Sequence, residues 1–196
     1  PLHKCIASAS LLSMIFTDKF IYHLPYYRIQ KRISQMGVPI PTSTFESWVK
    51  LGAEYIKPLY AAHRLYVFGE IYQQIDESPI KVQDRDKSGA THQGYMWVRY
   101  APLSKSVLFE YYKSRSANEP LRDLSKFKGY IQTDGYAGYT HLAENLGITH
   151  LSCWAHARRY FDKALQNDYD RASKVLKLIQ LLYANEALAR EDNMTH

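Results

Sequence analysis

Two aspartates, Asp76 and Asp134, have the residue type and the positions needed for metal chemistry. Asp76 ends a strand-like run over 71–76, and Asp134 ends another over 130–134. Carboxylates held a few ångströms apart repel each other unless a cation lies between them, and their oxygens select Mg²⁺ or Mn²⁺ over softer metals. Two such ions roughly 3.5 to 4 Å apart can activate an attacking water and stabilise the leaving oxygen in phosphodiester cleavage. Taken singly, Asp134 is also explained as an ordinary turn residue before Gly135. Asp76 taken alone is no stronger evidence for a metal site.

The order of elements predicted after residue 68 brings these two positions together. Strand-like patterns occur over 71–76 together with 79–83, which count as one strand, and then over 95–100, 106–112, 130–134 and 148–153. A turn is predicted over 84–89. Helices are predicted over 119–127, 139–146, 155–165 and 173–190. Three strands in series, then strands reached through helical crossovers, build an α/β fold, a mixed five-stranded sheet with flanking helices; this is the ribonuclease H-like arrangement. Its first and fourth strands are neighbours, so Asp76, near the end of the first, meets Asp134 at the end of the fourth.

The residues before this sheet predict a small helical region. Ser10 is placed to cap a helix that Pro25 ends, Gly37 to close a second helix, and 43–46 to form a capping box for a third. We therefore expect a helical region over 1–68, followed by a ribonuclease H-like catalytic domain over 69–196. Two helices joined by a tight turn near Lys31 and Arg32 fit either a DNA-reading helix-turn-helix or an ordinary helical hairpin.

A second group of chemically capable residues follows the predicted strand 148–153. Cys153 and His156 have Cys-x-x-His spacing, which resembles half of a zinc site, and His141 and His150 are close in sequence. Structural zinc needs four ligands from spaced pairs, however, and no second tight pair exists. We expect Cys153 to end the strand, and His156, Arg158 and Arg159 to begin a helix near the metals and contact DNA. The guanidinium groups suit phosphate oxygens; surface salt bridges are the alternative interpretation.

Composition narrows the class of protein. The 196 residues are 46% apolar, enough for a full core, and carry a net charge of +6, which favours a polyanionic partner or simple solubility. The absence of a long apolar run argues against a membrane span. The sequence has only two cysteines, which is consistent with a reducing cytoplasm. The sequence opens on Pro1 rather than Met, from which we expect it to begin inside a longer protein. The 17 tyrosines fit sheet packing, with base stacking as the alternative.

Several ordered strings closely resemble signatures of the Insertion Sequence 66 family of bacterial transposases. They are Asp76-Glu77-Ser78-Pro79, Asp134-Gly135-Tyr136-Ala137-Gly138-Tyr139 and Cys153-Trp154-Ala155-His156-Ala157-Arg158-Arg159-Tyr160-Phe161, with similar strings at 23–28 and 43–49. The resemblance implies a metal-dependent DNA transposase with an Asp-Asp-Glu triad, in which Asp76 and Asp134 match the first two members. It also implies two Mg²⁺ or Mn²⁺ ions in the complete enzyme, DNA as partner (transposon ends and target), and a homo-oligomer.

The third carboxylate of that triad is where the sequence departs from the family pattern. In such transposases the glutamate lies on a helix well after the second aspartate, and Glu186 is the one candidate on the last predicted helix. Its setting looks more like a helix that precedes the true glutamate, so we expect a catalytic domain truncated at its C-terminus. The alternatives are another ribonuclease H-like nuclease or an inactive DNA-binding remnant of a transposable element.

Overall fold

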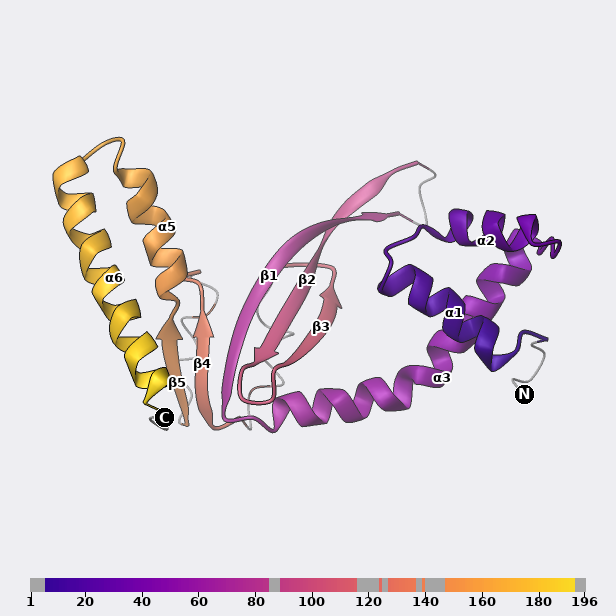
Figure 1. Ribbon diagram of the computed structural model, residues 1–196, viewed down its shortest axis with the longest axis horizontal. Helices are drawn as coiled ribbons and strands as arrows, with labels where there is room; N and C mark the ends of the chain where they lie inside the picture. The colour runs from indigo at the N-terminus through magenta and orange to yellow at the C-terminus, as the bar shows by residue number, and fades with distance from the viewer. Residues whose placement is uncertain are drawn as a thin grey trace. The chain divides into compact units, whose positions relative to one another are not determined.

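The computed structural model describes residues 6–84, 89–115, 124, 127–136, 139 and 147–192. The chain divides into two compact units, Pro1–Leu65 and Tyr66–His196, each of which is described by itself (Figure 1). Most residues of the helices predicted over 119–127 and 139–146, and of the turn predicted over 84–89, lie outside the described residues.

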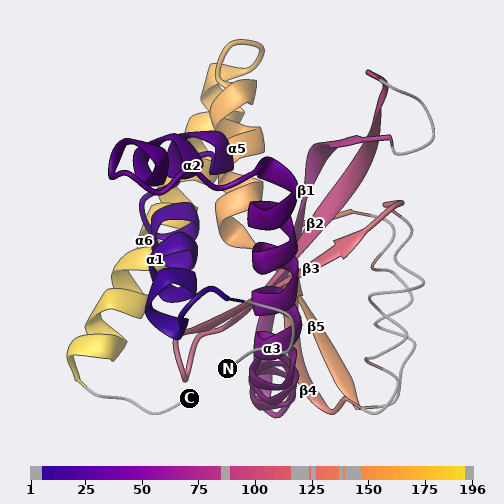
Figure 2. The same ribbon diagram turned by 90° about the vertical axis from the view of Figure 1, so that its right-hand side faces the viewer.

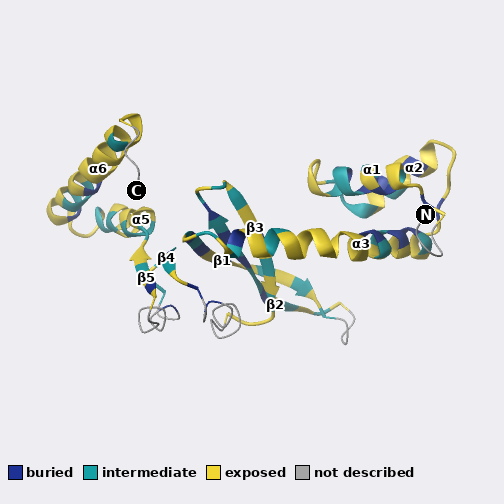
Figure 3. Ribbon diagram, turned by 90° about the horizontal axis from the view of Figure 1, so that it is seen from below, coloured by how far each residue is buried: buried dark blue, intermediate teal, exposed yellow. Residues whose placement is uncertain are grey.

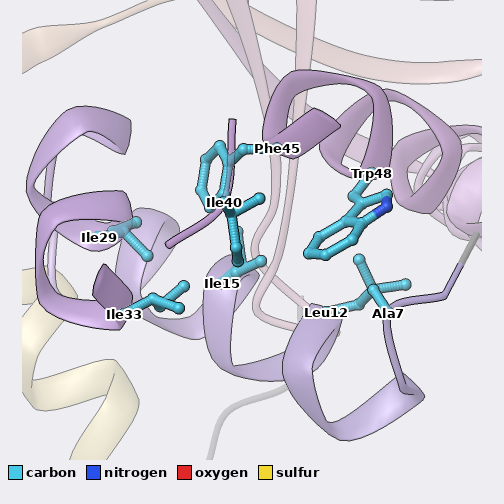
Figure 4. Packing of buried hydrophobic residues seen from close by; sticks show 8 residues of the cluster. All are labelled: Ala7, Leu12, Ile15, Ile29, Ile33, Ile40, Phe45 and Trp48. Atoms are coloured by element: carbon cyan, nitrogen blue, oxygen red, sulfur yellow. The ribbon is translucent and has the colours of Figure 1, made fainter. Parts of the chain in front are cut away.

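The first unit is helical. It contains α1 (Ala9–Phe20), α2 (Tyr26–Gln35) and most of α3 (Thr42–Phe68). Side chains from all three helices form one apolar core, shown in Figure 4: Ala7, Leu12, Ile15, Ile29, Ile33, Ile40, Phe45 and Trp48. Exposure then rises along α3, where residues 53–62 are all exposed (Figure 3). The core of this unit therefore rests on the first turns of α3.

A buried carboxylate joins α1 to α2. Asp18 is 5% exposed and forms an ion pair with Arg32, which holds its charge inside the unit. Arg32 was one of the two basic residues that favoured a DNA-reading helix, and the ion pair engages it within the protein. Lys31 is exposed.

The ends of these helices differ in part from the sequence prediction. The cap of α1 is Ser8, whose hydroxyl accepts from the Leu11 amide at 3.2 Å, and not Ser10. No capping box forms over 43–46, because α3 already begins at Thr42, where the Pro41 carbonyl accepts from the Phe45 amide at 3.0 Å. The predicted left-handed glycine is confirmed, since Gly37 has a φ of +89° after α2.

The second unit contains the mixed sheet that the sequence predicts. Its strands are β1 (Tyr72–Gln83), β2 (Thr91–Ala101), β3 (Ser106–Tyr112), β4 (Gly129–Thr133) and β5 (Ile148–Ser152). The five strands lie in the order β3-β2-β1-β4-β5. β1, β2 and β3 are antiparallel neighbours, whereas β4 is parallel to both β1 and β5. The first and fourth strands are thus adjacent, in the ribonuclease H-like arrangement (Figures 1 and 2).

The first strand is longer and more continuous than predicted. Residues 72–83 form one strand that joins the two predicted runs, so Asp76 lies within β1 rather than near its end. Pro79 is tolerated there because β1 pairs with β4 only over 72–74, and beyond that point one edge of β1 is unpaired.

Apolar side chains and two helices complete the second unit. The buried cluster beside the sheet consists of Ile75, Trp97, Leu124, Phe127, Ile131, Tyr139 and Ile148. After β5 come α5 (Trp154–Ala164) and α6 (Tyr169–Glu191), which pack against each other. Over the part of the chain that the structure describes, no helix combines the length and apolar character needed to cross a membrane.

Candidate metal centre

Asp76 and Asp134 lie side by side where β1 and β4 separate. The parallel register pairs Tyr72 with Tyr130 and Gln74 with Gln132, so two further residues along each strand place Asp76 beside Asp134. Ligand atoms of Asp76, Asp134 and His156 all lie within 4.8 Å of one another. The structure therefore brings together both sequence-predicted carboxylates and adds an imidazole from α5.

Main-chain hydrogen bonds fix the position of His156. The Cys153 amide donates to the Thr133 carbonyl at 2.9 Å, which joins the residue after β5 to the end of β4. The His156 amide in turn donates to the Cys153 carbonyl at 3.1 Å, in the first turn of α5. Since Thr133 directly precedes Asp134, the start of α5 is held next to the second aspartate.

Each aspartate uses one oxygen to orient itself. The Tyr136 amide donates to Asp134 Oδ1 at 3.1 Å, an Asx turn, and the Glu77 amide donates to Asp76 Oδ1 at 2.9 Å. Gly135 has no positive φ, and a Cβ at this position would meet nothing within 4 Å. The Asp134 side chain, rather than the conformational freedom of Gly135, therefore shapes the predicted turn.

This donor set fits a hard divalent cation. Each carboxylate keeps its Oδ2 in addition to the oxygen that orients it, and the buried His156 Nδ1 has no hydrogen-bond partner among the described residues. Oxygen ligands of this kind suit Mg²⁺ and Mn²⁺, and a cation between the aspartates offsets their repulsion.

A zinc site around Cys153 gains no support. Cys153 is a free cysteine, and within the described ranges the group that could hold a metal consists of Asp76, Asp134 and His156. His150, considered beside Cys153, is engaged elsewhere: its Nε2 lies 2.8 Å from Thr133 Oγ1, and burial lowers the pKa of its ring. His141 lies outside the described residues.

A third carboxylate, Glu77, lies next to Asp76 but has other partners. Successive strand residues point to opposite faces, and the Glu77 side chain is buried while Asp76 is exposed. The Tyr139 hydroxyl donates to Glu77 Oε2 at 2.6 Å, and Arg115 donates to Oε1 at 2.9 Å from Nε and 2.7 Å from Nη2. Burial and then the bond to Glu77 raise the pKa of Tyr139, and the same carboxylate raises the pKa of Arg115.

Aromatic contacts extend this network to the segment after β4. The Arg115 guanidinium lies 4.0 Å from the centroid of the Tyr136 ring, and Tyr136 meets Tyr139 edge-on with centroids 6.0 Å apart. The β1–β4 register ends at Gln74 and Gln132, so these contacts connect the two aspartate segments beyond the ladder. Sequence reasoning missed Glu77, Arg115 and Tyr139; the available signal was that Glu77 and Tyr139 lie within the two aspartate strings.

The remaining predicted residues lie on α5 and α6. Arg158 and Arg159 are exposed, and the structure gives neither of them an ion-pair partner among the described residues. Glu186 pairs with Arg190 one helical turn later and is not part of the Asp76 cluster. The structure thus places Glu186 on the face of α6 as a solvated ion-pair partner.

With the site geometry in place, the comparison with protein families decides the affiliation of the chain. Residues 4–196 match the family described as Transposase IS66 family. The chain belongs to this family. The match covers both units and all three strings that carried the resemblance.

The similar curated proteins of the IS66 family are themselves uncharacterised. The chain is 30% identical over 169 residues to protein y4jD of Sinorhizobium fredii (strain NBRC 101917 / NGR234), an alignment covering 80% of this chain and 33% of that protein. It is 26% identical over 201 residues to protein y4hP of the same organism, covering 94% of this chain and 35% of the relative. The chain thus spans about a third of the length of these relatives.

One solved structure shares a weak likeness with this IS66-family chain. It is a chain from the cryo-EM structure of the simian T-cell lymphotropic virus intasome in complex with PP2A regulatory subunit B56 gamma. The likeness covers 54% of this chain and 46% of that chain, with 18% sequence identity and a TM-score of 0.30. A score of this size adds nothing to the strand order described above.

Proposed function

We propose that this chain carries part of the catalytic centre of a DNA transposase, which cleaves phosphodiesters with divalent metal ions and transfers strands of an insertion sequence. The observation that carries the proposal is the convergence of Asp76 and Asp134 beyond the β1–β4 ladder, in a chain of the IS66 family. Neither aspartate is buried with an ion-pair partner, so the negative charges of both carboxylates are available to bind a cation.

The chain's own residues would act mainly by positioning. Bound Mg²⁺ or Mn²⁺, two ions in the complete enzyme, supplies activation of the attacking oxygen and charge stabilisation at the leaving oxygen. Asp76 and Asp134 would hold the cation through their carboxylate oxygens, each aspartate being oriented by a main-chain amide, and the hydrogen bond between Glu77 and Tyr139 connects the two segments. No covalent bond between enzyme and DNA is needed, because water and then a DNA 3′-hydroxyl attack the phosphorus.

The third member of an Asp-Asp-Glu triad belongs, in this proposal, to sequence outside these 196 residues. Glu186 already pairs with Arg190, and the relatives are about three times as long as the part they share with this chain. With two of three carboxylates, the chain would bind metal weakly. The complete protein would act as a homo-oligomer on two transposon ends and a target.

Substitution of the aspartates in the intact protein tests the proposal. Asp76→Asn or Asp134→Asn keeps the size of the side chain but removes the charge that holds the cation, so strand transfer should fall to background while DNA binding persists. Transfer is measured with labelled transposon-end duplexes and Mg²⁺ or Mn²⁺. Asp162→Asn, an exposed carboxylate on α5, is the matched control and should transfer normally. Retained transfer in either site variant contradicts the assignment.

The same assay separates the alternatives. Cleavage without selectivity for terminal inverted repeats would indicate another ribonuclease H-like nuclease. DNA binding by the intact protein with no cleavage under any divalent ion would indicate an inactive remnant.

A further inference from the structure

We infer that His156 is a ligand of the metal held by Asp76 and Asp134, so that this site has a nitrogen donor and prefers Mn²⁺ to Mg²⁺. The inference rests on the proposed function, because it takes the two-carboxylate metal site as its starting point. It gives His156 a role different from the DNA contact expected from its place beside Arg158 and Arg159.

The first support is distance. One ring nitrogen of His156 and one oxygen of each aspartate lie within 4.8 Å of one another. Ligands on opposite sides of a Mg²⁺ ion, each at about 2.0–2.1 Å, are about 4.1 Å apart. Neighbouring ligands around the same ion are about 2.9 Å apart, so side-chain rotations that draw the three ligand atoms closer together would enclose one ion.

The second support is an unpaired buried atom. His156 Nδ1 is buried, yet it has no hydrogen-bond partner in the described part of the chain. Buried polar atoms are almost always satisfied, because leaving one without a partner costs free energy. His150 shows the usual solution, since its Nε2 lies 2.8 Å from the Thr133 hydroxyl. The His156 ring therefore has a nitrogen that no described protein atom engages.

The third support is rigidity. A metal ligand must be held in place before the ion arrives, and His156 lies in the first turn of α5, attached through the main chain of Cys153 to the end of β4. Arg158 and Arg159, in contrast, are exposed on the same helix, where phosphate contacts require them to be. His156 is thus held beside the two aspartates, whereas Arg158 and Arg159 are exposed to solvent.

The chemical consequence is metal preference. Mg²⁺ favours a shell of oxygen atoms, whereas an imidazole nitrogen suits transition metals, and affinity for a nitrogen-containing site rises from Mn²⁺ towards Cu²⁺. A site with two carboxylates and one imidazole should therefore bind Mn²⁺ more tightly than Mg²⁺, and loss of the imidazole should reduce that difference.

Pulsed electron paramagnetic resonance on Mn²⁺ bound to this chain tests the inference directly. We expect the spectrum of the chain containing ¹⁵N-labelled histidine to show hyperfine coupling to one directly bound nitrogen. His156→Gln should abolish the coupling and raise the Kd for Mn²⁺ by at least about 10-fold, the lower bound for losing an outer-shell partner of a ligand, with a smaller change for Mg²⁺. Lys163→Gln, an exposed change on the same helix, is the matched control and should alter neither.

Each outcome separates this inference from the proposed function. Mn²⁺ binding that is lost in Asp76→Asn and Asp134→Asn, but shows no nitrogen coupling and no effect of His156→Gln, overturns the role of His156 and leaves the aspartate site intact. Mn²⁺ binding that is unchanged in the two aspartate variants overturns both. No Mn²⁺ binding by this chain at millimolar concentration overturns the role of His156, and strand transfer by the intact protein then decides the proposed function. The nitrogen coupling is measured on the unaltered chain, so it decides the question even if His156→Gln does not fold.

Discussion

Asp76 and Glu77 are adjacent carboxylates whose charges have different uses. The pleat of β1 leaves Asp76 exposed, where its charge is available to a cation, and buries Glu77, where Arg115 and Tyr139 compensate its charge. Because Arg115 also lies over the ring of Tyr136, one buried carboxylate orders the residues that follow Asp134. From the sequence alone, Asp76 and Glu77 would be assigned to the same site because they are adjacent. Their hydrogen-bond partners show that the two carboxylates have different roles.

Removing the Tyr139 hydroxyl should make the free energy of unfolding change less with pH in the alkaline range. Tyr139→Phe deletes a donor to buried Glu77, so it should lower the free energy of unfolding at neutral pH by about 1–2 kcal/mol. In the unaltered chain, burial raises the pKa of Tyr139 above the value of about 10 that it has when unfolded. Above that pH the unfolded state loses a proton that the folded state keeps, so the stability from Tyr139 is present below pH 10 and declines as pH rises.

Denaturant unfolding from neutral pH to above pH 10 measures this effect. The deficit of Tyr139→Phe should shrink above pH 10, by up to about 1.4 kcal/mol per pH unit. Tyr160→Phe, at a position that is 72% exposed, is the matched control and should follow the unaltered chain. If Tyr139→Phe lowers the free energy of unfolding by the same amount at every pH, Tyr139 has the same pKa in the folded and the unfolded chain, which contradicts the prediction.

At the scale of elements, the sequence predicts the sheet better than the residues that complete the site. Alternating patterns and the helical crossovers determine the strand order, and that order brings Asp76 to Asp134. Helix starts were misplaced at Ser10 and Ser43, because several hydroxyls compete for each cap and only the final chain path selects one. Glu77 and Arg115 have no local spacing signal, since their contact depends on segments that are distant in sequence.

The start of β4 depends on a glycine that cannot be replaced. Gly129 has a φ of +140°, and a Cβ there would lie 2.2 Å from the Ile71 carbonyl oxygen, a main-chain atom that also accepts from the Tyr130 amide at 2.7 Å. Gly129→Ala should therefore displace β4 from β1 and destabilise the fold by about 2–4 kcal/mol. Gly135→Ala is the matched control: its added Cβ meets nothing, so stability should change by less than about 0.5 kcal/mol.

Urea unfolding followed by far-ultraviolet circular dichroism compares the two glycine variants. Similar losses in both would show that the close approach of Gly129 to Ile71 does not control the pairing of β1 with β4. A selective loss in Gly129→Ala would also explain why the parallel ladder is short, because its first residue must pass directly beside the β1 main chain.

At the scale of the whole molecule, the charge distribution predicts where a polyanion would contact the chain relative to the candidate metal site. A net charge of +6 favours a polyanionic partner without locating the contact surface, but the structure places two exposed arginines in the first turns of α5, the helix that carries His156. Arg190, in contrast, pairs with Glu186 on α6. If the chain acts as proposed, exposed cations without ion-pair partners on the helix of His156 are the ones we expect to contact a phosphate backbone.

The salt dependence of DNA binding should reveal these arginines. Each phosphate that a protein neutralises releases counterions and contributes about −0.9 to the slope of log K against log salt concentration, so Arg158→Gln and Arg159→Gln should each reduce the slope by about 1. Fluorescence anisotropy with a labelled duplex of arbitrary sequence measures the slope, because the contact is to backbone rather than to bases. Arg190→Gln removes the same charge from a residue already paired with Glu186, and its slope should stay close to that of the unaltered chain. Equal slopes in all three variants would show that net charge alone, without a located contact at α5, attracts the DNA.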